Sequence, residues 1–236
     1  MRIFVLTGAG ISAESGLGTF RGKPGDGLWA KFDPMKLATP EAFAADPGAV
    51  HAFYNARRNN LLTTKPNPAH VALARLETEL AKRGDKLFLV TQNIDNLHER
   101  AGSRRVIHMH GELLKARCTQ CQAVVSWHDD LETTSVCPRC EQISALRPHV
   151  VWFGEMPFEM DMISDALSIS DLFVAIGTSG SVYPAAGFVA QARAAGIRTC
   201  EINLDASDNA DLFDDQRYGP ASEAVPVWVE EVLLSA

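Results

Sequence analysis

The chain has 236 residues, of which 46% are hydrophobic and 22% are charged, proportions typical of one large globular domain with a smaller attachment. Its formal net charge of -7 argues against a nucleic-acid-binding surface, which would need a basic face for the phosphates. No apolar stretch reaches the roughly 18 residues that a membrane span needs, and no basic-then-apolar leader precedes the first predicted strand, so we expect a cytoplasmic protein with neither nucleic acid nor membrane as a partner.

Short apolar runs alternate with helical patterns along the chain. Several runs are apolar on both faces, which is typical of a parallel sheet covered by helices on both sides. We therefore predict an α/β fold, a Rossmann-like doubly wound parallel sheet with a smaller zinc-ribbon and helical domain inserted. The predicted strands are residues 2–6, 86–91, 105–109, 171–177 and 197–203.

Two predicted helices begin with a proline that follows a capping residue. Asp46-Pro47 begins a helix that runs to about Leu62. Asn67-Pro68 begins a second helix over residues 68–83, and Gly84 ends it. Both helices follow the helical spacing of apolar residues rather than the alternation of a strand.

Two segments interrupt the strand and helix alternation. Residues 22–65 are rich in Gly and Pro at first and then helical, and residues 116–146 contain paired cysteines. We assign both segments to insertions that form the small domain. The Rossmann-like domain is then discontinuous and consists of residues 1–21, 66–115 and 147–236.

A glycine-rich loop follows the first predicted strand. Its sequence, Gly8-Ala9-Gly10-Ile11-Ser12-Ala13, fits the pattern G-x-G-x-x-G/A between a strand and a helix. Glycines there let the backbone approach a pyrophosphate, and the helix N-terminus supplies amide donors; a tight turn without a ligand is the alternative. A dehydrogenase would also carry an acidic residue about 20 positions on, at the end of a second strand, to hold a ribose hydroxyl. Lys31-Phe32-Asp33-Pro34 lies there in a Gly/Pro-rich segment, which disfavours hydride transfer.

Four of the five cysteines form two C-x-x-C pairs. Cys118 and Cys121 are separated from Cys137 and Cys140 by 15 residues, a spacing typical of zinc ribbons in a reducing compartment. Four thiolates complete a tetrahedron and leave no position for water or substrate, so we expect one structural Zn²⁺ that performs no chemistry. Four reduced cysteines without a metal are the alternative. We expect Cys200 to be a buried thiol in a strand.

Several longer strings follow one another along the chain. They are Gly8-Ala9-Gly10-Ile11-Ser12-Ala13-Glu14-Ser15-Gly16, Thr19-Phe20-Arg21-Gly22, Thr91-Gln92-Asn93-Ile94-Asp95-Asn96-Leu97-His98, His110-Gly111, Val151-Trp152-Phe153-Gly154-Glu155, Gly177-Thr178-Ser179 and Ile202-Asn203. In this order they resemble the sirtuin family over essentially the whole chain, and the joint match is highly specific although each fragment alone is not. One departure is Gly18, where we expect a bulkier residue before Thr19.

The resemblance implies an NAD-consuming protein-lysine deacylase. In sirtuins the acyl oxygen of a modified lysine attacks the ribose carbon that bears nicotinamide, and the products are nicotinamide, free lysine and O-acyl-ADP-ribose. Before these products are released, a base activates a ribose hydroxyl. This task suits histidine because its ordinary pKa is near 6.5. The resemblance gives this role to His110. The sequence itself does not decide between His108 and His110, which lie two apart on a predicted strand and should point to the same side.

The resemblance also implies a set of contacts with NAD. Asn93 and Asp95 would hold the nicotinamide end, although Asn93 is also well placed to cap a helix. Phe20 would shield the reactive carbon from water, and Arg21 would order the cofactor loop. Gln92 would touch the ribose. Thr178, Ser179 and Asn203 would hold the adenosine side. The full expected set is Gly8, Ala9, Gly10, Ala13, Glu14, Thr19, Phe20, Arg21, Gln92, Asn93, Ile94, Asp95, Gly177, Thr178, Ser179, Asn203 and Ala221.

Tyr54 and Arg57 lie three residues apart and therefore share one face of the first predicted helix. The pair resembles the Tyr-x-x-Arg with which one sirtuin branch binds the distal carboxylate of succinyl and malonyl groups. An arginine fork matches a carboxylate and a phenol adds a third donor, whereas an unpaired carboxylate would be costly to bury. An amphipathic helix with an exposed Arg and a packed Tyr is the alternative. Val151, Phe153 and Gly154 complete the expected substrate contacts, with backbone groups of Val151 and Gly154 pairing with the peptide like a strand.

The sequence therefore predicts a desuccinylase and demalonylase with deacetylation as a second activity, acting on acyl-lysine proteins as a monomer. A protein ADP-ribosyltransferase is the nearest alternative, because the same activated ribose could be captured by a protein side chain. A non-catalytic, NAD-sensing zinc-ribbon adaptor is a further alternative. The adaptor would not need His110, Asn93 and Asp95 together, so their joint presence favours an enzyme.

Overall fold

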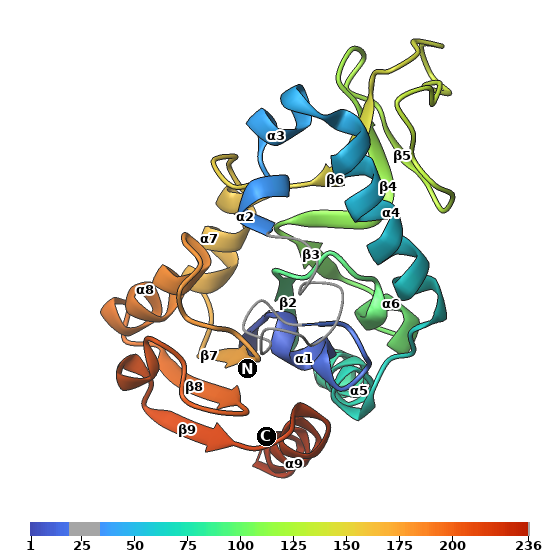
Figure 1. Ribbon diagram of the computed structural model, residues 1–236. Helices are drawn as coiled ribbons and strands as arrows, with labels where there is room; N and C mark the ends of the chain where they lie inside the picture. The colour runs from blue at the N-terminus through green and yellow to red at the C-terminus, as the bar shows by residue number, and fades with distance from the viewer. Residues whose placement is uncertain (19–33, 236) are drawn as a thin grey trace.

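The computed structural model describes residues 1–18 and 34–235, which form a large α/β part with a smaller part beside it (Figure 1). The large part contains a six-stranded sheet of order β3-β2-β1-β7-β8-β9, in which every pair is parallel. Among the described residues, no helix is both long and apolar enough to cross a membrane. The strands of this sheet are β1 (Arg2–Thr7), β2 (Lys86–Thr91), β3 (Val106–His108), β7 (Leu172–Ile176), β8 (Arg198–Asn203) and β9 (Asp215–Tyr218).

The sequence predicts five of these six strands and misses the edge strand β9. Its residues, Asp215 to Tyr218, contain no apolar run and remain mostly exposed, so no hydrophobic pattern marks them. Cys200 is buried in β8, which confirms that prediction. Side chains that alternate along β1 enter different layers, because Ile3 and Val5 belong to one core and Phe4 and Leu6 to the other.

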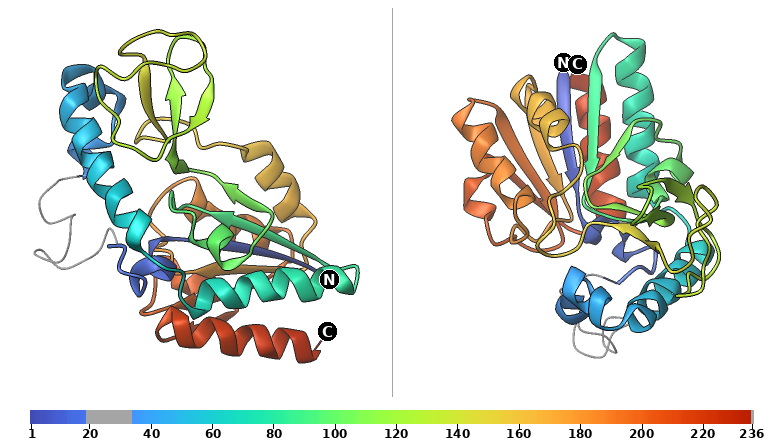
Figure 2. Two further views of the ribbon diagram at one scale, coloured as in Figure 1. Left: turned by 90° about the vertical axis from the view of Figure 1, so that its right-hand side faces the viewer. Right: turned by 90° about the horizontal axis from the view of Figure 1, so that it is seen from above.

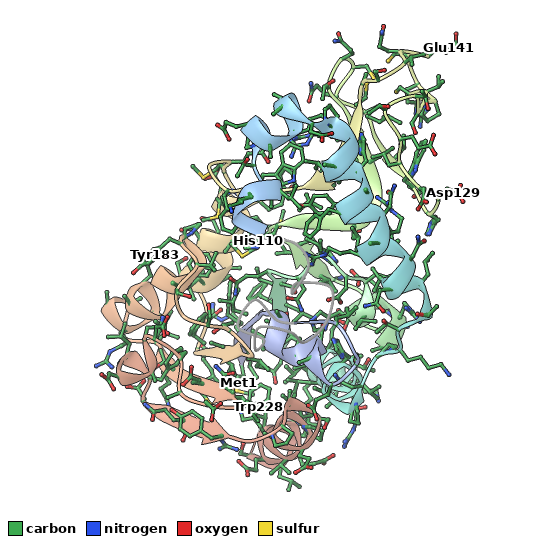
Figure 3. All side chains as sticks on the ribbon, viewed as in Figure 1. Met1, His110, Asp129, Glu141, Tyr183 and Trp228 are labelled. Atoms are coloured by element: carbon green, nitrogen blue, oxygen red, sulfur yellow. The ribbon has the colours of Figure 1, made fainter. Side chains whose placement is uncertain are left out.

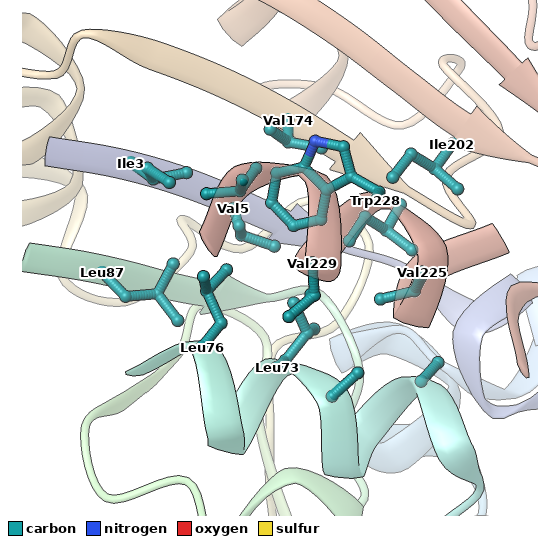
Figure 4. Packing of buried hydrophobic residues seen from close by; sticks show 14 of the residues in the cluster. Ile3, Val5, Leu73, Leu76, Leu87, Val174, Ile202, Val225, Trp228 and Val229 are labelled. Carbon is teal, nitrogen blue, oxygen red and sulfur yellow. The ribbon is translucent and has the colours of Figure 1, made fainter. Parts of the chain in front are cut away.

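Helices cover both faces of the sheet, as the view from above shows (Figure 2). The helices α5 and α9 pack together on one face, where Val229 of α9 lies next to Leu73 of α5 and Trp228 of α9 lies beside Val5 and Val174 of the sheet (Figure 4). The other face is covered by α7 and α8. The helical segments of this part are α1 (Ala9–Ala13), α5 (Pro68–Lys82), α6 (Leu97–Ala101), α7 (Met160–Ser168), α8 (Phe188–Ala194) and α9 (Ala221–Ser235), with short 3-10 turns at Ala185–Gly187 and Ala210–Leu212.

The two predicted helices begin at their prolines, as expected. In α5 the Asn67 side chain accepts a hydrogen bond from the backbone N–H of Ala69, at 2.9 Å, and the His70 ring accepts one from the backbone N–H of Asn67, at 3.3 Å. This reciprocal cap satisfies donors that the first helical turn leaves without partners. The other predicted helix begins at Pro47. Asp46 caps it by accepting a hydrogen bond from the backbone N–H of Ala49 at 2.9 Å.

Within the described ranges 1–18 and 34–235, the smaller part combines three helices with an antiparallel sheet of order β5-β4-β6. Its core joins α4 to this sheet through Phe53, Tyr54, Leu113 and Trp152. The small sheet extends to both sides of residues 116–146, the segment in which the sequence places the zinc ribbon. Its elements are α2 (Pro34–Leu37), α3 (Pro40–Ala45), α4 (Pro47–Thr63), β4 (Gly111–Cys118), β5 (Val124–Ser126) and β6 (Leu146–Val150).

Candidate active site

A cleft of about 890 Å³ lies at the carboxyl ends of the strands, between the large part and the smaller part. This is the place where ligands bind in doubly wound sheets, because the strand order reverses between β1 and β7. Figure 3 labels His110 at the junction of the two parts. The cleft is lined by every expected NAD and substrate contact that the structure describes. Thr19, Phe20 and Arg21 lie outside the described residues.

Two glycine loops pack backbone to backbone at the floor of the cleft. The N–H of Gly8 donates to Ile176 O at 3.0 Å, and the N–H of Gly10 donates to Gly177 O at 2.9 Å. A Cβ at Gly8 would lie 2.7 Å from Gly177 O, and a Cβ at Gly10 would lie 2.7 Å from the Gly177 Cα. The close approach of these loops therefore accounts for both glycines, and the same loops leave backbone exposed to the cleft.

Asn93 and Asp95 belong to a buried hydrogen-bond network under the cleft. The Asn93 amide donates to Gly8 O and to Ser12 Oγ, both at 3.1 Å, which commits both of its N–H groups and leaves its oxygen to accept. Ser12 donates to Asp95 Oδ2 at 3.0 Å, and Leu97 N–H donates to Asp95 Oδ1 at 3.1 Å. Burial raises the pKa of Asp95.

Asn93 does not cap a helix, although its place in the sequence also allowed that role. The helix α6 begins at Leu97, and Asn96 occupies the position before it. Asp95 accepts from the first helical N–H, whereas the Asn93 side chain is directed to Gly8 and Ser12. Asn93 is therefore part of the cleft floor.

The two candidate histidines have different environments. His110 Nδ1 lies 3.0 Å from Gln92 O, and a carbonyl only accepts, so Nδ1 carries the hydrogen and Nε2 keeps a lone pair. Burial lowers the pKa of His110, partly opposed by that hydrogen bond, which keeps the ring neutral and able to act as a base. His110 lines the cleft.

His108, in contrast, has both ring nitrogens next to acceptors. Nδ1 lies 3.3 Å from Asn93 O, and Nε2 lies 2.7 Å from Glu99 Oε1. Burial opposes a charge on the ring, but the hydrogen bond and charge of Glu99 outweigh it and raise the pKa of His108. Protonation, which the raised pKa favours, makes both nitrogens donors and leaves no lone pair for a base. The structure thus separates two histidines that the sequence does not distinguish.

The far end of the cleft floor is closed by α9. Glu14 accepts hydrogen bonds from the backbone N–H of Ser222 at 2.8 Å and from its hydroxyl at 2.7 Å, which holds the neighbouring Ala221 at the cleft. The Asn203 amide donates to Thr178 O at 2.7 Å and so joins the ends of β7 and β8. Ser222 has no role in the sequence prediction, because a partner 208 positions away leaves no local pattern.

The opposite end of the cleft contains Tyr54 and Arg57 of α4. Tyr54 is 2% exposed, and its Oη accepts a hydrogen bond of 3.0 Å from the Trp152 Nε1–H. Burial raises the pKa of Tyr54 to about 12 against the opposing charge of Arg57, so the phenol keeps its hydrogen. Burial lowers the pKa of Arg57 to about 10 against the opposing effects of Tyr54 and Asp95, so the guanidinium is positive at neutral pH.

The loop after β6 borders this end of the cleft. Val151 N–H donates to His110 O at 2.9 Å, which ties the loop to the residue before β4. Phe153 N–H donates to Ala38 O at 2.9 Å, which ties the loop to the helical segment. Gly154 has a φ of 89°, a conformation that favours glycine, and the turn it makes keeps the loop beside the cleft.

Ser12 and Trp152 are further residues of the site for which the sequence predicts no role. Both stand within the strings that resemble the sirtuin family, but their partners are distant in the sequence. Ser12 links Asn93 to Asp95 from 81 and 83 positions away, and Trp152 reaches Tyr54 across 98 positions. Contacts between such distant positions have no spacing signal in a single sequence.

The four paired cysteines converge, and Figure 3 labels Glu141, the residue after Cys140, at the outer end of the smaller part. Their sulfur atoms all lie within 4.8 Å of one another, with Cys118 to Cys140 at 3.7 Å and Cys121 to Cys137 at 3.8 Å. A zinc tetrahedron with Zn–S bonds of about 2.3 Å has edges of about 3.8 Å, so the thiolates are positioned to bind one zinc. Figure 3 labels Glu141 and His110 at opposite ends of the smaller part, in keeping with a structural metal at the cysteines.

The fold and the cleft define a class of protein, an NAD-binding α/β enzyme of Rossmann type that carries a four-cysteine zinc ribbon. The model of the Sir2 family matches residues 8–184. The chain belongs to the Sir2 family.

Curated relatives are similar over nearly the whole chain. The NAD-dependent protein deacylase of Caulobacter vibrioides is 63% identical over 235 residues, which cover 99% of this chain and 97% of the relative. The NAD-dependent protein deacylase of Escherichia coli strain K12 is 56% identical over 234 residues, which cover 98% of this chain and 82% of the relative.

Solved structures share the fold. A Sir2 homologue in complex with NAD has a TM-score of 0.88 at 39% identity, with 99% of this chain and 90% of that chain covered. A Sir2 structure with an inhibitor, 2'-O-acetyl-ADP-ribose and a deacetylated p53 peptide has a TM-score of 0.79 at 27% identity, with 99% and 93% covered.

Proposed function

We propose that this chain, an NAD-dependent protein deacylase, prefers lysines that carry a succinyl or malonyl group and removes acetyl groups as a second activity. NAD is consumed, and the products are nicotinamide, free lysine and O-acyl-ADP-ribose. The observation that carries the proposed preference is the pair Tyr54 and Arg57, which line the same end of the cleft from adjacent turns of α4.

The chemistry of this pair favours a carboxylate. Arg57 brings a positive guanidinium that pairs bidentately with two carboxylate oxygens, and Tyr54 brings a phenol that keeps its hydrogen. Much of the surrounding surface is apolar, including Leu61, Leu113 and Val150, so an acyl carboxylate would lose its water there. Without the two donors that loss would be costly, and with them a charged acyl group is favoured over a neutral one.

The other site residues have matching roles in the proposal. His110 accepts the proton of a ribose hydroxyl at Nε2, because its Nδ1 is committed to the Gln92 carbonyl. Asn93 accepts from the nicotinamide amide at its side-chain oxygen, and Asp95 holds Ser12 beneath it. The Val151 carbonyl pairs with the backbone of the substrate peptide.

The test is the replacement Arg57→Met, which keeps length and apolar packing but removes the charge. We expect the ratio of kcat/KM for a succinyl-lysine peptide to that for the matched acetyl-lysine peptide to fall about 100-fold, because a buried carboxylate would lose its charged partner. Rates of nicotinamide and free-lysine release, measured on both peptides, give the ratio.

Arg75→Met is the matched control. Arg75 lies on α5, pairs with Glu230 on the surface and has a side chain that is 52% exposed, so its loss should leave the ratio unchanged. Equal losses on both peptides in Arg57→Met would contradict the proposed acyl preference. So would a wild-type enzyme that turns over the acetyl peptide faster.

A further inference from the structure

We infer that Trp152 is a specificity-determining positioning residue, which holds the Tyr54 hydroxyl as a hydrogen-bond donor toward the acyl group. The inference rests on the proposed preference for charged acyl groups and adds a residue to it. Trp152 makes no part of the base or of the NAD-binding floor, and its effect reaches the substrate through Tyr54.

The direction of one hydrogen bond carries the inference. An indole N–H can only donate, so in the 3.0 Å contact between Trp152 Nε1 and Tyr54 Oη the phenol oxygen is the acceptor. The phenol hydrogen must then point away from Trp152. Both side chains are 2% exposed, and Tyr54 lines the cleft beside Arg57, so the direction open to that hydrogen leads to the acyl end.

Without the indole N–H the phenol would have a choice. A phenol both donates and accepts, and Arg57 next to it is itself a donor that could be satisfied by the phenol oxygen. With Trp152 occupying the oxygen, Tyr54 presents its hydrogen beside the positive guanidinium of Arg57. A phenol donor next to a guanidinium suits a carboxylate and offers nothing to the methyl of an acetyl group.

Trp152 is itself held firmly in place. The guanidinium carbon of Arg147 lies 3.4 Å from the centroid of the indole ring, and the Phe43 ring lies 5.2 Å from it. Glu155 binds Arg147 through both carboxylate oxygens, at 2.6 and 3.0 Å, and also accepts from Trp152 N–H at 2.8 Å. The ring therefore keeps one orientation, which is what a residue that sets the direction of a donor requires.

The experiment is a double-mutant cycle with Trp152→Phe and Tyr54→Phe, read as the succinyl-to-acetyl ratio of kcat/KM on matched peptides. Trp152→Phe removes the N–H and keeps an aromatic ring. We expect it to lower the ratio about three- to tenfold, mainly through a higher KM for the succinyl peptide, because one oriented donor is lost from binding. In the Tyr54→Phe background, Trp152→Phe should cause no further fall.

Two outcomes would overturn the inference alone: an unchanged ratio in Trp152→Phe, or a further fall of similar size in the Tyr54→Phe background. If neither Arg57→Met nor Tyr54→Phe changes the ratio, the proposed acyl preference fails and the inference fails with it. The two failures are thus distinguishable. If only the role of Trp152 is wrong, Arg57→Met and Tyr54→Phe still lower the ratio.

Two further variants guard against a general loss of structure. Trp228→Phe removes a buried indole from the core between the sheet and α9, and Trp228 does not line the cleft, so we expect the ratio to stay unchanged. If Trp152→Phe does not fold, benzothienylalanine at position 152 replaces the N–H with sulfur at nearly the same shape. We expect this replacement to lower the ratio as Trp152→Phe would, and an unchanged ratio would again overturn the inference.

Discussion

The two ends of the cleft are built in different ways. At the cofactor end the floor consists of loops at the carboxyl ends of β1, β2 and β7, where backbone groups and the buried Asn93 and Asp95 are fixed by the sheet itself. At the acyl end the contacts come from α4 and from the loop after β6, which belong to the smaller part. Binding of the cofactor thus depends on the sheet. Acyl selectivity depends on side chains of the smaller part, which can change without altering the sheet.

The largest effect should come from the residue between the two ends. His110→Ala removes the base, so we expect deacylation of succinyl and acetyl peptides to fall at least about 100-fold while NAD still binds. Free lysine is measured by mass spectrometry, and NAD binding by calorimetry. His128→Ala is the matched control, because this histidine is exposed and lies outside the cleft. Retention of most activity in His110→Ala would contradict the assignment of the base.

Removal of zinc should destabilise the smaller part more than the large part. Asn55 of α4 donates to Leu131 O at 3.0 Å and accepts from Leu131 N–H at 2.9 Å, so the cysteine-bearing segment is joined to the helix that carries Tyr54 and Arg57. In Cys137→Ser we expect the chain to lose its zinc and hydrogen exchange to rise in β4, β6 and α4 by about tenfold or more, well before it rises in β1.

The control for zinc removal is Cys200→Ser, which changes a buried thiol of β8 outside the four-cysteine cluster. Metal analysis should find one zinc per chain in this variant and none in Cys137→Ser. Uniform exchange over both parts after zinc loss would show that the two ends of the cleft are not separable in this way.

The smallest effect should be a decrease in the free energy of unfolding in mild acid. It involves one histidine of each part. Burial, with a smaller effect of Arg58, lowers the pKa of His51 in α4 to about 4, and burial against the charge of Glu99 lowers that of His70 in α5 to about 4. Protonation therefore favours the unfolded chain, so stability is complete above the unfolded pKa near 6.5 and falls as the pH drops toward 4.

We expect the free energy of unfolding in urea to be about 2 kcal/mol lower at about pH 5.5 than at about pH 7.5. His108 acts in the opposite direction, because its pKa is raised by Glu99 against burial and its stabilisation grows on protonation. Equal or greater stability at the lower pH would contradict the expectation that the neutral His51 and His70 outweigh His108.

Features with local spacing can be predicted from the sequence, whereas contacts between distant positions cannot. The glycine loop, the strands and the paired cysteines all have local spacing that follows from backbone geometry or metal coordination. Tyr54 and Arg57 also have local spacing, as neighbours on one helical face. The Trp152 contact and the distinction between His108 and His110 depend on atoms brought together from distant positions, which no periodicity records.

The edge strand β9 and the partner of Glu14 show the same limit. β9 pairs with β8 through its backbone and buries little, so its composition resembles a loop. Glu14 was expected among the NAD contacts, and its carboxylate also holds Ser222 at the start of α9. Long-range hydrogen bonds of this kind can be assigned only once the fold has placed both partners.

The central claim, that the acyl end selects a charged group, is tested most directly by product analysis of the wild-type protein. Purified protein is incubated with NAD and equal amounts of matched succinyl-lysine and acetyl-lysine peptides, and free lysine, nicotinamide and acyl-ADP-ribose are measured by mass spectrometry. We predict stoichiometric products with faster formation of O-succinyl-ADP-ribose than of the acetyl product. Turnover of the acetyl peptide alone would leave a Sir2 deacylase but contradict the role of Tyr54 and Arg57.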